Sequence, residues 1–115
     1  MAGNPHFIAV SAERVGDNLY VSGKEAGLGN ETQVHIVVSS EASCINPGGK
    51  HPKAENKETF TAQGDFPVQN GQATFNLTLV ANFQPSCSPP MDIVWGDITI
   101  TDVAHGVSKT IKGPF

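Results

Sequence analysis

The chain has 115 residues, a length typical of one domain, and a formal net charge of −4. Its cationic residues form no dense cluster, so nucleic-acid binding is not expected, because neutralising phosphates requires clustered Lys and Arg. Apolar residues reach 38% and alternate with polar ones, which argues against disorder. The apolar runs are too short to cross a bilayer. We predict a single domain over residues 1–115, with residues 1–4 as a flexible start and with no membrane span.

Alternation of apolar and polar residues predicts short β-strands along the whole chain. The expected strands span residues 6–15, 19–22, 32–44, 59–63, 65–69, 72–80, 91–102 and 107–111. Between two of them, Asn70 and Gly71 form the strongest hairpin signal, since a type I′ turn needs positive φ at both positions. No window shows a 3.6-residue period over three turns, so essentially no helix is expected.

The most regular strand lies within Thr32–Pro52. Val34, Ile36 and Val38 occupy one face of it, and the same parity directs Cys44 inward. The strand is expected to end in a Pro- and Gly-rich loop over Asn46–Lys57, because proline removes a ladder donor and glycine readily turns the chain.

The strand from Met91 to Asp102 has a break in its pattern. Ile93 and Trp95 occupy odd positions, whereas Ile98 and Ile100 occupy even ones. A β-bulge at Gly96-Asp97 would return all four to the core, and the alternative is a change of sheet at that point. We predict that Trp95 is a core residue.

These elements predict an all-β domain of seven to nine short antiparallel strands. We expect a two-sheet sandwich of immunoglobulin-like architecture, with a small barrel as the alternative. The order Cys, Cys, Trp differs from that of antibody-type domains, in which the tryptophan lies between the two cysteines.

Two cysteines, Cys44 and Cys87, stand alone at strand ends beside Pro-rich loops. They are not arranged as the C-x-x-C pair typical of zinc or thioredoxin-type sites. We predict a Cys44–Cys87 disulfide, and therefore a secreted protein from an oxidising compartment. Two unrelated buried thiols are the alternative.

Titratable residues give no clear sign of chemistry in the sequence. The four histidines lack the short spacings of metal ligands and are expected on the surface or in loops: His6, His35, His51 and His105. The acidic residues of one strand recur every five positions and are interpreted as solvated: Asp92, Asp97 and Asp102. A G-x-S-x-G elbow is absent from the sequence. We predict no metal site, no cofactor and no enzymatic activity.

Several short motifs give a resemblance over nearly the whole chain. They are NPHF at the start, KEAGL at Lys24–Leu28, C-x-N-x-GGK-x-P at Cys44–Pro52, W-x-D-I-T-I-x-D from Trp95, and a final G-x-F. The sequence thereby resembles small secreted proteins of actinobacterial type. The resemblance implies a β-sandwich fold and secretion, but no functional site.

Three functions remain open. The first is a non-catalytic binding or cell-surface module that recognises a glycan or an acidic protein surface. Its site would comprise two loops joined by the disulfide and carry Lys50, His51, Lys53, Lys57, Gln84 and Ser86. The second is a structural subunit that self-associates through edge strands, first through Asn4–Val10. The third is a protease inhibitor that uses the Pro-stiffened segment Ser88–Asp92, in which Met91 would fill a specificity pocket.

Overall fold

The computed structural model describes residues 4–45, 54–84, 86–87 and 91–115. These residues form seven strands: β1 (His6–Val15), β2 (Asn18–Ala26), β3 (Gln33–Ile45), β4 (Ala54–Gln69), β5 (Gln72–Leu79), β6 (Asp92–Asp102) and β7 (Val107–Ile111). The described part of the chain contains no helix, so the all-β class and the strand number are confirmed. It accordingly offers no long apolar helix that could cross a membrane. The predicted flexible start at residues 1–4 falls, except for Asn4, outside the described residues.

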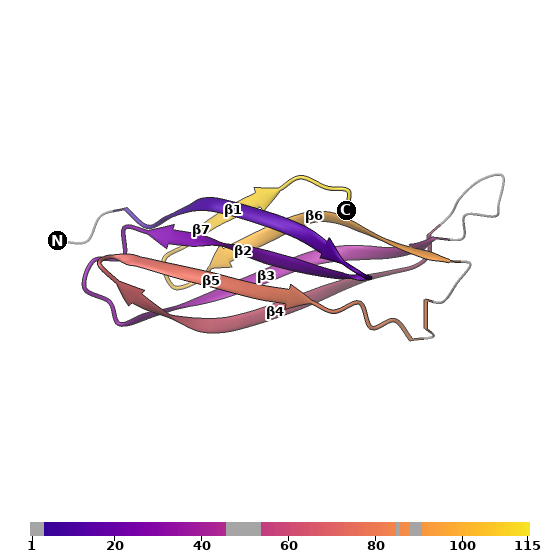
Figure 1. Ribbon diagram of the computed structural model, residues 1–115, viewed down its shortest axis with the longest axis horizontal. Helices are drawn as coiled ribbons and strands as arrows, with labels where there is room; N and C mark the ends of the chain where they lie inside the picture. Colours follow the sequence, from indigo (N-terminus) through magenta and orange to yellow (C-terminus); the bar gives the residue numbers. More distant parts are fainter. Residues whose placement is uncertain (1–3, 46–53, 85, 88–90) are drawn as a thin grey trace.

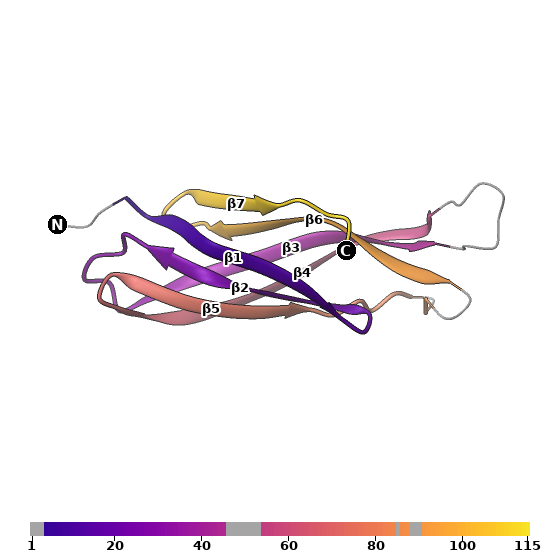
Figure 2. The same ribbon diagram turned by 45° about the horizontal axis from the view of Figure 1, so that its top comes forward.

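The strands form one nearly closed antiparallel sheet in the order β1-β2-β5-β4-β3-β6-β7 (Figure 1). Its weakest join is between β4 and β5, which pair only at Val68–Ala73 and Gln69–Gln72. The two outer strands, β1 and β7, lie against each other. Figure 2 shows β6 and β7 on one side of the molecule and β2 and β5 on the other. The sheet therefore wraps around a single apolar core that includes Trp95, Phe75 and Ile36.

Arg14 reinforces the side on which the sheet remains open. Its guanidinium donates to the backbone carbonyls of Ile93 and Phe115, the latter at 3.3 Å. The same group donates to Gly16 O at 2.8 Å and pairs with Asp17 at 3.0 Å. One side chain near the end of β1 thus joins the β1–β2 turn to β6 and to the last residue.

The central strand β3 confirms the predicted alternation, whereas β4 does not. Val34, Ile36 and Val38 are buried, and Cys44 points inward as expected. However, β4 is one continuous strand that pairs with β3 as far as Ala54. The prediction of two short strands at 59–63 and 65–69, preceded by a loop up to residue 57, is therefore wrong. Pairing with the long β3 keeps this polar, Gly64-containing segment extended, although its own sequence indicates a loop and a break.

Two β-bulges decide which side chains face the core. The bulge in β6 is confirmed: the β3–β6 register shifts opposite Glu41, and Ile93, Trp95, Ile98 and Ile100 are all buried. A second bulge, in β1 between Ile8 and Ser11, was not predicted. There Ala9 has a φ of 52°, which turns Val10 toward the core. The Asn70-Gly71 hairpin is confirmed by φ values of 54° and 76°.

Candidate functional site

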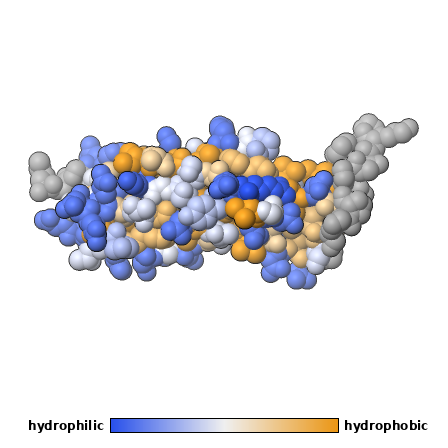
Figure 3. Space-filling view, viewed as in Figure 1, coloured by the Kyte–Doolittle hydropathy of each residue, from blue (hydrophilic) through white to orange (hydrophobic). Residues whose placement is uncertain are grey.

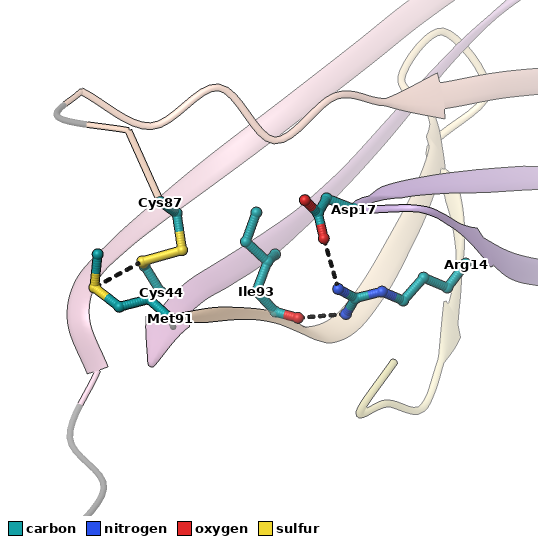
Figure 4. Close-up of a disulfide and its surroundings, with 6 residues drawn as sticks. All are labelled: Arg14, Asp17, Cys44, Cys87, Met91 and Ile93. Carbon is teal, nitrogen blue, oxygen red and sulfur yellow. Dashed lines mark hydrogen bonds and ion pairs between the residues drawn. A yellow bond between two sulfur atoms is a disulfide. The ribbon is translucent and has the colours of Figure 1, made fainter. Parts of the chain in front are cut away.

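One end of the molecule carries the predicted disulfide. Cys44 and Cys87 are bonded with an S–S distance of 2.07 Å, which confirms the pairing. The bond joins the end of β3 to the segment that follows β5 (Figure 4). Met91 Sδ lies 3.7 Å from Cys44 Sγ, so the start of β6 also packs against the disulfide. The end of β3 is therefore fixed to a stretch that lies 43 or more residues further along the chain, from Cys87 to the start of β6.

The predicted binding residues are only partly described. Lys57 lies within β4 opposite Ser43 and is exposed, and Gln84 and Ser86 are also exposed. Three of the predicted residues lie outside the described part of the chain: Lys50, His51 and Lys53. The same holds for most of the proposed inhibitory segment, namely Ser88, Pro89 and Pro90. Its remaining apolar residue, Met91, is half-buried against the core.

A different group of titratable residues meets at the opposite end of the molecule. Strands β2 and β6 both run toward that end (Figure 1) and bring Glu25 and Asp102 together inside the sheet. Both carboxylates are fully buried. His105 approaches from the β6–β7 turn, and Glu31 approaches from the connection between β2 and β3. We call these four residues the acid–histidine cluster.

Short contacts hold His105 between two carboxylates. Its Nδ1 lies 2.6 Å from Asp102 Oδ2, and its Nε2 lies 2.7 Å from Glu31 Oε2. The backbone N–H of His105 also donates to Asp102 Oδ1 at 3.3 Å. Burial lowers the pKa of His105, but these hydrogen bonds outweigh burial, so its pKa is raised above the usual value. The imidazole is therefore fixed in orientation by partners on both sides.

Glu25 is the unusual member of the cluster. Among the described residues, no donor bonds to either of its carboxylate oxygens, although both are buried. One of its oxygens, one of Asp102 and a ring nitrogen of His105 lie within 4.8 Å of one another. Burial, followed by the adjacent Asp102 carboxyl group, raises the pKa of Glu25 to about 8. Buried polar groups are normally hydrogen-bonded, so this carboxyl group requires an explanation.

The sequence analysis missed this cluster, and its interpretation of Asp102 as solvated is wrong. The alternation of inward and outward positions along two strands could have revealed the cluster. Once the β6 bulge places Ile98 and Ile100 inward, Asp102 lies on the same inward row. In β2, the inward row that begins with Leu19 reaches Glu25, but the predicted strand ended too early to include it.

Two shallow surface hollows are formed by described residues elsewhere. One lies beside the β4–β5 hairpin and is lined by Pro67 and Gln72 among others. The other lies over β2 and β5 next to the β1 bulge. Neither is lined by Lys57, Gln84 or Ser86. In comparisons with known proteins, no protein-family model, no curated protein and no solved structure matches this chain.

Proposed function

We propose that this protein is a secreted, non-catalytic binding module that uses the disulfide end as its contact surface. The observation that carries the proposal is the Cys44–Cys87 bond, which ties the segment after β5 to the end of β3. The same end is held by the pairing of Ile45 with Ala54, the residues that flank the undescribed part of the β3–β4 connection. Loops whose stems are fixed lose less conformational entropy when they bind a partner.

Charge indicates the chemistry of that partner. Three of the six lysines lie within residues 46–57, although the whole chain is acidic: Lys50, Lys53 and Lys57. We infer an acidic glycan as the ligand, with an acidic protein patch as the alternative. The disulfide is consistent with an extracellular location, as is the resemblance to small secreted proteins of actinobacterial type.

The proposal is tested with an array of neutral and acidic glycans probed by the oxidised protein. Changing the three lysines of residues 46–57 to Ser should abolish binding to acidic glycans. The chain offers a matched control with the same change in net charge, because its other three lysines lie elsewhere on exposed strand positions or after β7: Lys24, Lys109 and Lys112. Equal binding by both triple variants would place the site elsewhere. If the wild-type protein bound no glycan on the array, this ligand class would be rejected.

A second candidate is self-association through strand edges. The outer edges of β1 and β7 form no ladder with another strand of the described chain, although the two strands pack against each other, and backbone groups on these edges would have to pair with a neighbouring molecule. The bulge at Ala9 interrupts one of these edges, and bulges are a common protection against edge-to-edge pairing. Sedimentation over a wide concentration range tests this candidate, and a strict monomer would reject it.

For the architecture, we infer a two-layer sandwich of immunoglobulin-like type within the nearly closed sheet. The layers would be β1-β2-β5 and β4-β3-β6-β7, because only two residue pairs join β4 to β5, whereas β3 pairs with β4 along its whole length. A crystal structure in which β4 and β5 pair along most of their length would contradict this division.

A further inference from the structure

We propose that the acid–histidine cluster is a binding site for a divalent transition-metal cation of the zinc class, with Glu25, Asp102 and His105 as its protein ligands. This site is independent of the proposed glycan surface, because the two lie at opposite ends of the sheet. It also replaces the sequence-based prediction that the chain has no metal site, which rested on the absence of short histidine spacings.

The buried carboxylate of Glu25 is the strongest support. A buried acidic group is normally paired with a cation or hydrogen-bonded to a donor. Glu25 has no such donor among the described residues, and one of its oxygens lies within 4.8 Å of a ligand atom of Asp102 and of His105. With all three carboxylates ionised and His105 neutral, the cluster would carry three negative charges, which a divalent cation would largely compensate.

The spacing of the donor atoms suits coordination. One donor from each of the three ligands lies within 4.8 Å of the others. In a tetrahedral zinc site, with metal–ligand distances of about 2.0–2.2 Å, donor atoms lie roughly 3.3–3.6 Å apart. Small side-chain rotations would therefore bring them into place. Three protein ligands would leave the fourth position for water, an arrangement common to zinc sites that are not purely structural.

Glu31 adds a feature that is typical of metal sites. If Nδ1 of His105 binds the metal, Nε2–H donates to Glu31, which already lies 2.7 Å away. Metal-binding histidines usually donate their second ring nitrogen to a carboxylate in this way, which orients the ring and increases its basicity. The side chains of His105 and Glu31 are 21% and 41% exposed, so a cation can approach from their side. On the face drawn in Figure 3, hydrophilic residues predominate at this end of the molecule.

The donor set also indicates which metals should bind. An imidazole nitrogen with two carboxylates suits zinc and similar transition metals. Calcium prefers six to eight oxygen ligands, and magnesium keeps most of its waters, so both should bind much more weakly. The selectivity order is therefore part of the proposal.

Calorimetric titration of the metal-stripped, disulfide-intact full chain with Zn²⁺ tests the site. We expect one saturable site in the wild-type protein and a rise in melting temperature on zinc addition. Glu25→Gln should weaken zinc binding by at least about 100-fold, because it removes a ligand. This variant keeps the side-chain volume and introduces no charge, so it should fold. Glu31→Gln changes an exposed side chain and should weaken binding by about 10–100-fold.

Matched controls separate this site from zinc bound adventitiously at surface histidines. Glu58→Gln makes the same chemical change at an exposed position, and Asp92→Asn and His35→Gln remove an exposed carboxylate and an exposed imidazole. All three should leave the main site unaltered. Co²⁺ should give visible absorption bands in the wild-type protein that Glu25→Gln removes. Zinc binding that is equal in wild type and Glu25→Gln, the absence of saturable binding, or a preference for Ca²⁺ would each overturn the proposal. The lysine-to-Ser triple variant should bind zinc normally, so failure of the glycan proposal would be distinguishable.

Discussion

At the scale of single residues, the burial of Trp95 was predictable and the burial of Glu25 was not anticipated. Trp95 follows from an apolar pattern that one bulge makes consistent, and its side chain is fully buried. Its indole Nε1–H donates to Asp17 O at 3.0 Å, and Phe60 packs edge-on against its ring at 5.7 Å. A polar residue on an inward-facing row cannot be identified as buried from the sequence, because the alternation of apolar and polar residues assigns it to an exposed position.

Replacing Trp95 by Ala should lower the free energy of unfolding by about 3–5 kcal/mol, because it leaves a large cavity at the centre of the core. Trp95→Phe keeps an aromatic ring there and should cost less. Urea denaturation followed by circular dichroism measures both variants. A loss of only about 1 kcal/mol for Trp95→Ala, the average for any point substitution, would show that the ring contributes little packing.

At the scale of strands, bulges explain both the success and the failure of prediction. The β6 bulge was predictable because Ile93 and Ile98 differ in parity and both must be buried. The β1 bulge was not, because apolar residues occupy both rows of that strand and conceal the shift at Ala9. The continuity of β4 was hidden in the same way: its extended shape comes from its partner β3, which no local pattern in β4 reveals. The acid–histidine cluster draws on two strands, a turn and a connection, and only the fold brings them together.

The β1 bulge predicts a strict requirement for glycine on the neighbouring strand. A Cβ at Gly23 would lie 2.8 Å from Val10 Cγ1 and 3.0 Å from both Val10 Cα and Phe75 Cζ. We therefore expect Gly23→Ala to lower the free energy of unfolding by about 1–3 kcal/mol through overpacking.

Gly64→Ala is the matched control for this substitution. Its added Cβ would meet Phe66 no closer than 3.4 Å, so the loss of stability should be much smaller. Both variants are compared by urea denaturation. Equal midpoints for the two would mean that Val10 moves away freely and that the bulge does not require glycine at position 23.

The pairing of β3 with β4 brings together a histidine and an acidic residue, so we expect their contribution to stability to depend on pH. His35 lies opposite Asp65, with Nδ1 2.8 Å from Oδ1, and its Nε2 lies 2.8 Å from Gln63 Oε1. The hydrogen bond to Gln63, then that to Asp65, raises the pKa of His35 above 6.5. A raised pKa in the folded state means that this pair stabilises the fold fully below pH 6.5, and that its contribution is lost as pH rises through the folded-state pKa.

NMR titration of the His35 imidazole measures this shift directly. Asp65→Asn should bring the pKa of His35 down toward 6.5, because the ion pair is lost. Asp92→Asn removes an exposed carboxylate from a different strand and should leave the pKa unchanged. A His35 pKa that stays raised in Asp65→Asn would assign the shift to Gln63 alone.

At the scale of the whole molecule, stability depends on how the two ends and the open side of the sheet are fixed. Arg14 links β1 to β6 and to the C-terminal residue. Phe115 extends this link, since its backbone exchanges hydrogen bonds of 2.8 and 2.9 Å with Trp95 beyond the β6 bulge. The disulfide fixes one end of the sheet. At the opposite end, the acid–histidine cluster joins β2, β6 and the connections that follow them. A metal in that cluster would therefore stabilise the end that has no covalent link in the described chain.

The disulfide should be the largest of these contributions. Cys44 and Cys87 are separated by 43 positions, and closing a loop of that length stabilises the fold by about 4 kcal/mol in the chain-entropy model. Replacing both cysteines by Ala should lower the free energy of unfolding by that amount, since Ala keeps the site apolar. The free energy of unfolding should also fall more steeply with urea concentration, because the unfolded chain without the cross-link exposes more surface. Intact mass with and without reduction, using alkylation of unfolded protein, provides the covalent control. A double variant as stable as the wild type would contradict this expectation. The bond would then serve only to hold Cys87 and its neighbours Gln84 and Ser86 against β3. Its role would lie in shaping the proposed contact surface rather than in stabilising the sheet.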